Sequence, residues 1–211
     1  MGNSEPAALG IIMLDTQFER PAGDVGNAAS WDFPVRFKRV PGASPDRVIR
    51  RSDAELIDEF IVAGEELIAE GCTAIITSCG FMARHQARLA DALSVPVAAS
   101  SLVQLPMMEL ALGADGQVGV ITYDAASLTP DMLVACGARR EAPVAGVPSG
   151  GAFRTLIEGG GSYDRAVLEA EILTVARDLV ARHPKIKAIL LECTNMPPFA
   201  SAIAQACGMP V

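Results

Sequence analysis

The strongest constraint on the fold is a repeat within the chain. Residues 74–97 align without gaps with residues 188–211, at an offset of 114 positions. Each copy reads as an apolar strand, one polar residue, a cysteine (Cys79 or Cys193), a short turn, a helix and a Pro-Val pair. Unrelated strand–helix units can look alike in composition, but composition alone does not account for a cysteine at the same point in both copies. We therefore interpret the chain as a diverged duplication whose halves face each other across a cleft.

A looser correspondence links the first strands of the two halves. Residues 9–12 and 118–121 share an apolar-Gly-apolar-apolar pattern, and each is followed by an aspartate, Asp15 or Asp124. The first half then has a Gly-, Pro- and Asn-rich loop up to Val35, and a loop of this length is usually functional, so a lid is one interpretation. The repeat also predicts a further strand and helix beyond the C-terminal end, which the second lobe is expected to lack.

Short β-branched runs alternate with amphipathic stretches, a pattern typical of a parallel sheet covered on both faces. The predicted strands are Leu9–Leu14, Val35–Val40, Thr73–Thr77, Val95–Ala98, Gln117–Thr122, Val144–Val147 and Lys187–Leu191. The predicted helices are Asp53–Glu70, Met82–Leu93, Leu102–Leu112, Ala125–Ala135, Tyr163–Arg182 and Pro197–Ala206. We predict an α/β protein with two pseudo-symmetric flavodoxin-like lobes, residues 1–98 and 99–211, and an active site in the cleft between them.

The bulk properties exclude several classes of protein. The chain has 211 residues, half of them apolar, and a net charge of -8, so it has no basic face for nucleic acid. The N-terminal segment Met-Gly-Asn-Ser-Glu-Pro lacks the basic region of a signal peptide, and residues 9–14 are too short for its apolar core. Since no apolar run approaches the roughly 18 residues of a membrane span, we predict a soluble cytoplasmic protein.

The cysteine and histidine content argues against disulfides and metal. The five cysteines are an odd number, no C-x-x-C pair occurs, and there are only two histidines. Cys72, Cys136 and Cys207 are interpreted as small buried apolar residues.

Cys79 and Cys193 are different because each stands where a strand ends and a helix begins. The carboxyl ends of parallel strands line the ligand crevice, and the amides of a helix N-terminus favour a thiolate. Pro197-Pro198 is typical of a helix first turn and supports the second placement. Two thiols facing one carbon from opposite sides can invert a stereocentre, one acting as base and the other as acid. Backbone amides of the turns would hold the substrate carboxylate.

No cofactor is predicted. Pyridoxal phosphate needs a pocket lysine, and the lysines are Lys38, Lys185 and Lys187, of which the last two stand in a polar turn. Gly159-Gly160-Gly161 lacks the spacing of a nucleotide-binding loop. His85, on the helix after Cys79, is interpreted as a solvated or capping residue rather than a partner of the thiol.

The chain resembles the aspartate/glutamate racemase superfamily, which includes glutamate, aspartate and hydantoin racemases. The resemblance covers nearly the whole chain and is carried by residues 10–16, 77–80, 118–122 and 192–195. It implies two α/β lobes, a cofactor-independent site between them, and a homo-oligomer, often a dimer. It also implies that Cys79 and Cys193 are catalytic. The substrate-binding residues that it implies are Asp15, Thr16, Ser78, Gly80, Phe81, Thr122, Ser127, Thr194 and Asn195.

The sequence departs from the glutamate racemases after both cysteines. Gly80-Phe81 replaces their usual Asn-Thr, and Asn195 replaces their usual histidine, so the resemblance does not favour glutamate as the substrate. We predict an isomerase that racemises or epimerises an amino acid or a cyclic derivative such as a hydantoin. The alternative is a one-cysteine lyase or isomerase, such as a decarboxylase or a maleate-type isomerase, acting on a dicarboxylate. A non-catalytic binder of small molecules is a third hypothesis.

Overall fold

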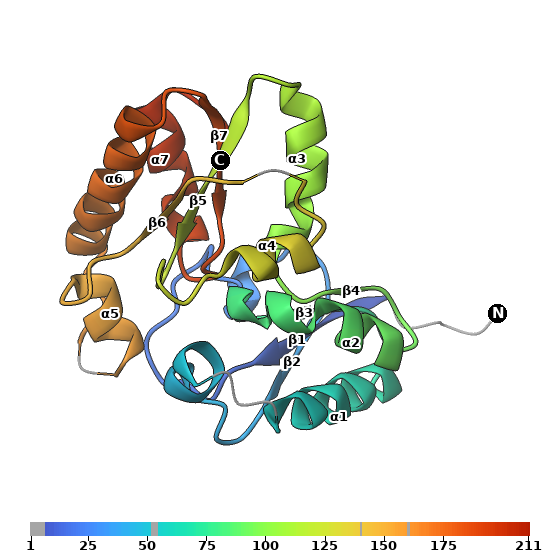
Figure 1. The fold of residues 1–211 in the computed structure, drawn as a ribbon. Coiled ribbons are helices and arrows are strands. Elements are labelled where there is room, and N and C mark those ends of the chain that lie inside the picture. Colours follow the sequence, from blue (N-terminus) through green and yellow to red (C-terminus); the bar gives the residue numbers. More distant parts are fainter. Residues whose placement is uncertain (1–6, 52–54, 140, 160) are drawn as a thin grey trace.

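The computed structural model describes residues 7–51, 55–139, 141–159 and 161–211, which form two lobes, each built on a parallel sheet (Figure 1). The first sheet has four strands in the order β2-β1-β3-β4. The second has three strands in the order β6-β5-β7. The strands are β1 Ala8–Met13, β2 Val35–Arg39, β3 Cys72–Thr77, β4 Val97–Ala98, β5 Gln117–Thr122, β6 Val144–Gly146 and β7 Ile186–Leu191.

The helices cover the faces of these sheets. In the first lobe α1 packs across β1, β2 and β3, and in the second lobe α3 and α6 lie on opposite sides of the sheet (Figure 1). The α-helices are α1 Leu56–Ala69, α2 Gln86–Ala92, α3 Leu105–Leu112, α4 Pro130–Ala135, α5 Ala152–Ile157, α6 Arg165–Arg182 and α7 Ala200–Cys207. Shorter helical turns are η1 Ala28–Ser30, η2 Asp46–Arg50, η3 Gly80–His85, η4 Ser101–Gln104 and η5 Pro197–Phe199.

The central strands are apolar on both faces, as is typical of parallel sheets whose faces are covered. Ile11 and Ile12 of β1, and Val120 and Ile121 of β5, are fully buried. This is the reason that the strands could be predicted from their runs of β-branched residues.

The internal repeat is present in the backbone hydrogen bonds. The N–H of Ile75 donates to the carbonyl of Pro96 at 2.9 Å, and the N–H of Ile189 donates to that of Pro210 at 2.9 Å. Both members of the second pair lie 114 residues after those of the first, which is the offset of the sequence repeat. The two halves therefore share local geometry as well as sequence pattern.

One predicted helix is wrong in its first turn. The stretch Ala125–Ala135 was expected to be helical throughout, but α4 begins only at Pro130. The Asp124 carboxylate accepts from the Ala126 N–H at 3.2 Å and from the Ser127 hydroxyl at 3.0 Å, which holds the intervening residues in a turn. The structure also contains α5 and η2, which the sequence pattern did not predict.

Two other predictions concern, in part, residues that the structure does not describe. The N-terminal segment, residues 1–6, lies outside the described residues, as do residues 53–54 of the first predicted helix. Among the described residues, no helix is long and apolar enough to cross a membrane.

The long loop after β1 is docked onto the second lobe. Asp24 in this loop is buried, with an exposed fraction of 1%. The N–H of Val25 donates to the carbonyl of Thr194 at 3.3 Å, and the Asn195 amide donates to Asp24 at 2.7 Å. The loop that the sequence marked as a candidate lid therefore joins the two lobes in this structure.

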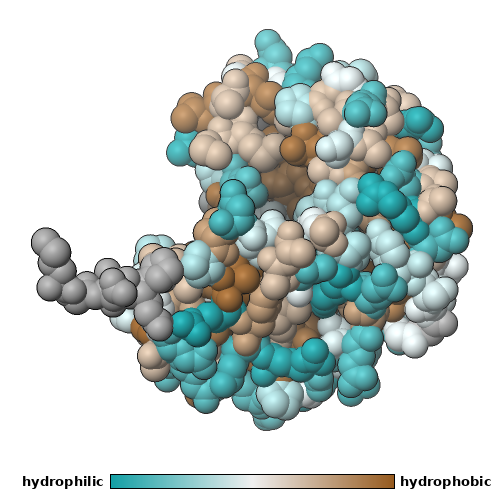
Figure 2. Space-filling model, turned by 180° about the vertical axis from the view of Figure 1, so that it is seen from behind, coloured by the Kyte–Doolittle hydropathy of each residue, from teal (hydrophilic) through white to brown (hydrophobic). Residues whose placement is uncertain are grey.

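Exposed apolar side chains lie on both lobes, and the second lobe has several of them. They include Met107 and Leu110 of α3 and Val134 of α4. Seen from behind, the upper lobe has a hollow with apolar walls (Figure 2). The homo-oligomer expected from sequence stays a prediction, and these side chains offer a surface for it.

Candidate active site

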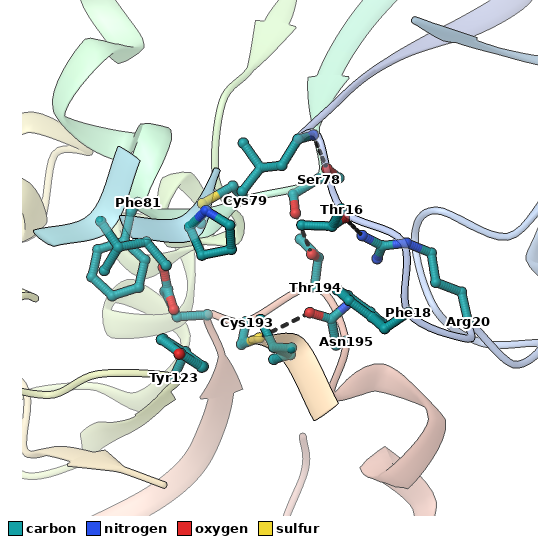
Figure 3. Close-up of a pocket in the computed structure, with 16 residues that line it drawn as sticks. Thr16, Phe18, Arg20, Ser78, Cys79, Phe81, Tyr123, Cys193, Thr194 and Asn195 are labelled. Atoms are coloured by element: carbon teal, nitrogen blue, oxygen red, sulfur yellow. Dashed lines mark hydrogen bonds between the residues drawn. The ribbon is translucent and has the colours of Figure 1, made fainter. Parts of the chain in front are cut away.

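A pocket between the two lobes brings both predicted catalytic cysteines together. Cys79 follows β3 and Cys193 follows β7, and their side chains point into the same space from opposite lobes (Figure 3). The cavity volume is about 30 Å³, which is more than the roughly 10–15 Å³ that one water molecule needs by the same measure.

Burial dominates the acidity of Cys79, although its turn favours the thiolate. Burial and then the negative charge of Glu192 raise the pKa of the Cys79 thiol to about 12. The backbone N–H groups of Phe81 and Met82 and the charge of Arg84 act in the opposite direction and lower this pKa. The amides at the start of η3 thus act as the sequence predicted, but burial outweighs them.

Cys193 is held more firmly as a neutral thiol. Its Sγ–H donates to Asn195 Oδ1 at 3.5 Å. The orientation of that amide is fixed because its Nδ2 donates to Asp24, whose carboxylate can only accept. Burial, followed by the charges of Glu192, Cys79 and Asp24, raises the pKa of Cys193 well above its ordinary value, and only the Asn195 backbone N–H lowers it.

Glu192 is a buried carboxyl group in the wall of the same pocket. Its exposed fraction is 0%, and one oxygen, Oε2, accepts from the Thr122 hydroxyl at 2.7 Å. The other oxygen, Oε1, is buried and has no hydrogen-bond partner among the described residues. Burial raises the pKa of Glu192 to about 7, and the Thr122 hydroxyl and the Tyr123 backbone N–H lower it.

One end of the pocket is polar. Thr16, Ser78 and Thr194 lie on this side together with Arg20 (Figure 3). Arg20 donates to Thr16 Oγ1 at 2.8 Å and pairs with Asp24 at 3.0 Å. The Thr194 hydroxyl donates to the Ser78 carbonyl at 2.7 Å and so ties the two cysteine turns together. These groups are suited to bind a carboxylate.

The other end of the pocket is aromatic. Phe81 and Tyr123 lie on the side opposite Arg20 (Figure 3). The Tyr123 hydroxyl donates to Glu158 at 2.7 Å, and Arg50 of the first lobe pairs with the same carboxylate. Tyr123 thus belongs to a set of contacts that joins the two lobes beside the pocket.

Most of the predicted site residues line the pocket, but three do not. Those that line it are Thr16, Ser78, Cys79, Gly80, Phe81, Cys193, Thr194 and Asn195. Asp15 lies outside, where its carboxylate accepts from the Gly42 N–H at 2.9 Å and pairs with Arg39. The Ser127 hydroxyl is bound to Asp124, and Thr122 is fully buried behind the pocket, where it supports Glu192 rather than a ligand.

Several lining residues were missed by the sequence analysis. Glu192 stands in the quoted Glu-Cys-Thr-Asn motif, and an acidic residue at the end of a buried strand was the available signal. Phe18 and Arg20 come from the long loop, and Ile157 comes from the unpredicted helix α5. No local pattern links these residues to the cysteines. Among the described residues, no group of three or more His, Cys, Asp or Glu side chains could hold a metal ion.

The fold is similar to those of solved decarboxylase and racemase structures. A variant of arylmalonate decarboxylase has a TM-score of 0.66 with 16% identity, over 97% of this chain and 86% of that protein. A glutamate racemase from Bacillus anthracis has a TM-score of 0.60 with 16% identity, over 97% of this chain and 75% of the racemase. The predicted class of fold, two α/β lobes with parallel sheets, is confirmed.

Sequence comparison places the chain in a particular family. A dimethylsulfoniopropionate lyase from Durusdinium sp. clade D is 32% identical over 99% of this chain and 72% of its own length. Dimethylsulfoniopropionate lyase 3 of Emiliania huxleyi is 31% identical over 97% of this chain but only 56% of its own length. The chain belongs to the dimethylsulfoniopropionate lyase family. No protein-family model matches it.

Proposed function

We propose that this chain is a lyase that eliminates dimethyl sulfide from dimethylsulfoniopropionate or a closely similar sulfonium carboxylate, with Cys79 as the base. The proposal corresponds more closely to the alternative predicted from sequence, a one-cysteine lyase, than to the racemase, although the substrate is not a dicarboxylate. It rests on the family relationship and on one structural observation, the unequal environments of the two thiols.

A racemase that works in both directions needs two thiols that can exchange the roles of acid and base. Here Cys193 donates its proton to Asn195 Oδ1, which stabilises the neutral thiol. Cys79 instead faces backbone N–H groups and the charge of Arg84, which stabilise a thiolate. This inequality fits a reaction that needs a single base.

Elimination from the sulfonium carboxylate is such a reaction. The Cys79 thiolate takes a proton from the carbon next to the carboxylate, and the electron pair of that C–H bond forms the C=C bond of acrylate. The C–S bond breaks with its electron pair remaining on sulfur, so dimethyl sulfide leaves as a neutral molecule and needs no proton from an acid. The Cys79 thiol then releases its proton to solvent. The hydroxyl groups of Thr16 and Ser78 would hold the carboxylate and the charge that develops on it, and Thr194 would hold the Ser78 turn in place.

The racemase remains the second candidate function because both sulfurs line one pocket. In that reaction Cys193 would deliver a proton to the face opposite Cys79. Isotope exchange separates the two candidates, since racemisation in deuterated water labels the α-carbon without breaking any other bond.

The test is to incubate the protein with dimethylsulfoniopropionate in deuterated water and follow dimethyl sulfide by gas chromatography and acrylate by proton NMR. A panel of amino acids and hydantoins is followed under the same conditions. The proposal requires equal amounts of dimethyl sulfide and acrylate, and their loss in Cys79→Ala. Deuterium incorporation into an amino acid or hydantoin, without sulfide release, would replace the lyase with the racemase.

A further inference from the structure

When Glu192 is ionised, no positively charged group among the described residues lowers its pKa. Its side chain is fully buried, and Oε1 has no hydrogen-bond donor among the described residues. The groups that favour its ionised form are the Thr122 hydroxyl and the Tyr123 backbone N–H, neither of which carries a positive charge. An ionised carboxyl group in such a place is costly unless a cation approaches it.

The carboxyl group lies between the two cysteine turns. It directly precedes Cys193 in the chain, and a Cβ atom added to Gly80 would come within 2.2 Å of its Oε1. Gly80 in turn directly follows Cys79. The charge of Glu192 raises the pKa of both thiols, so this carboxyl group is close enough to affect the ionisation of each.

The remaining charges of the pocket are arranged asymmetrically. Arg20 is the positive group of the lining, and it lies at the polar end with Thr16 and Ser78 (Figure 3). Glu192 contacts Thr122 and Tyr123, so it belongs to the aromatic end. The pocket therefore has a hydrogen-bonding end, where Arg20 is paired with Asp24, and an acidic, aromatic end, with the two sulfurs between them.

We propose that Glu192 is a specificity-determining residue whose buried carboxylate selects substrates with a sulfonium or quaternary ammonium group. The inference rests on the proposed function, which supplies a substrate with a carboxylate at one end and an onium group at the other. An onium group donates no N–H or O–H hydrogen bond and attracts anions and aromatic faces, which the unpartnered Oε1, Phe81 and Tyr123 provide. The carboxylate of the substrate would face Arg20 and Thr16.

The same arrangement links binding to the chemistry. A thiolate at Cys79 beside an ionised Glu192 would place two negative charges in one buried pocket. A bound onium group offsets one of them, so the thiolate forms more readily when the substrate is present. A ligand of the same shape without the positive charge would lack this effect.

The test compares two ligands of the same shape, 3-(trimethylammonio)propanoate and 4,4-dimethylpentanoate, which differ in the positive charge. Binding is measured by calorimetry at pH 8.5, where Glu192 is ionised, because its pKa is about 7. We expect the wild-type protein to prefer the cation by at least tenfold, and Glu192→Gln to reduce the preference to less than threefold. The control is Asp131→Asn, which removes the same charge from an exposed position of α4 and should keep the wild-type preference.

The wild-type protein supplies a second test that needs no substitution. Preference for the cation should fall as the pH is lowered from 8.5 to 5.5, because protonation removes the charge of Glu192. The titratable and charged groups around this carboxyl group and the two thiols are Tyr123, Cys79, Arg84, Cys136, Cys193 and Asp24. Binding of 4,4-dimethylpentanoate, which has the same carboxylate but lacks the ammonium charge, reports on the other groups, including His85, at each pH.

The results separate this inference from the proposed function. An unchanged preference in folded Glu192→Gln, or a wild-type preference that does not depend on pH, would overturn the role of Glu192 even if dimethyl sulfide is released. A preference that depends on Glu192, in a protein that releases no dimethyl sulfide, would support the selection of cations and reject the lyase.

Discussion

The turns after the two cysteines have nearly the same backbone and very different side chains. Met82 N–H donates to the Cys79 carbonyl at 3.0 Å, and Met196 N–H donates to the Cys193 carbonyl at 3.0 Å. The residue before each cysteine donates to the first strand of its own sheet at 2.8 Å, from Ser78 in one lobe and Glu192 in the other. Yet Ser78 stands opposite Glu192, Gly80 opposite Thr194, and Phe81 opposite Asn195 in the repeat.

This difference shows what the duplicated fold provides and what the individual residues add. The shared backbone brings two thiols to one pocket from opposite lobes. The side chains then make the thiols unequal, since the buried Cys193 donates its proton to Asn195, whereas Phe81, at the corresponding position after Cys79, has no side-chain acceptor. Each pair of corresponding positions offers a test of that inequality.

The largest expected effect concerns the cysteines themselves. Cys79→Ala should reduce the release of dimethyl sulfide by about 10³-fold or more, because it removes the base. Cys193→Ala should reduce it by only about tenfold, because it removes a neutral thiol from the pocket wall. Initial rates at saturating substrate measure both effects, and equal losses would mean that the two thiols share the proton transfer.

The next effect concerns Gly80 and Thr194. Gly80→Ala should destabilise the protein by about 3 kcal/mol, because the added Cβ would lie 2.2 Å from Glu192 Oε1. Thr194→Ala should cost about 1–2 kcal/mol, because it removes the hydrogen bond to the Ser78 carbonyl. Urea unfolding gives both values. Gly150→Ala, where the added Cβ meets no atom within 4 Å, is the control and should be close to neutral.

The residues before the two cysteines, Ser78 and Glu192, should differ in how their contribution to stability depends on pH. Burial raises the pKa of Glu192 from 4.5 to about 7. The stability that comes from its neutral form is therefore present below pH 4.5 and is lost as the pH rises through 7. Glu192→Gln should match wild type at pH 4.5 and be more stable by on the order of 3 kcal/mol at pH 8.5.

Ser78→Ala is the matched substitution for that experiment. It removes the hydroxyl that accepts from the Leu14 N–H at 3.1 Å, so it should destabilise the protein by a similar amount at both pH values. A stability difference between Glu192→Gln and wild type that does not change with pH would contradict the assignment of a neutral Glu192 at low pH.

The smallest expected effect concerns Asn195. Asn195→Ala removes the acceptor of the Cys193 thiol proton, so the pKa of Cys193 should fall by less than about one unit, because a thiol is a weak donor. The pKa of Cys79 should not change. The rate of alkylation of each cysteine as a function of pH measures this, with Phe81→Leu as the substitution at the corresponding position. A shift at Cys79 alone would show that the Asn195 amide does not act on Cys193.

Much of this architecture could be predicted because it is encoded locally. The buried strands are runs of β-branched residues, and β5 begins and ends at the predicted residues, Gln117 and Thr122. The repeat around the cysteines indicated their common pocket, because parallel strands bring their carboxyl ends to one edge. Helix α5 was missed because its start depends on Glu171 of a distant helix, which accepts from the N–H groups of Ala152 and Phe153.

The parts of the site that escaped prediction depend on long-range contacts. Asp24 is buried only because the long loop crosses to the other lobe and meets Asn195 there. Asp15 follows the first strand as the predicted ligand should, but Gly42 and Arg39 draw its carboxylate away from the pocket. The choice between isomerase and lyase depends on such contacts, since the same two cysteines line the pocket for either activity.

The most direct test of the unequal thiols is the alkylation of the wild-type protein by iodoacetamide between pH 8 and 10.5, with each cysteine followed by mass spectrometry. The two residues are almost equally exposed, at 6% for Cys79 and 7% for Cys193, and the alkylating species is the thiolate, so the difference between their rates reports on acidity. The account predicts that Cys79 is modified faster throughout this range. Equal rates, or faster modification of Cys193, would contradict it.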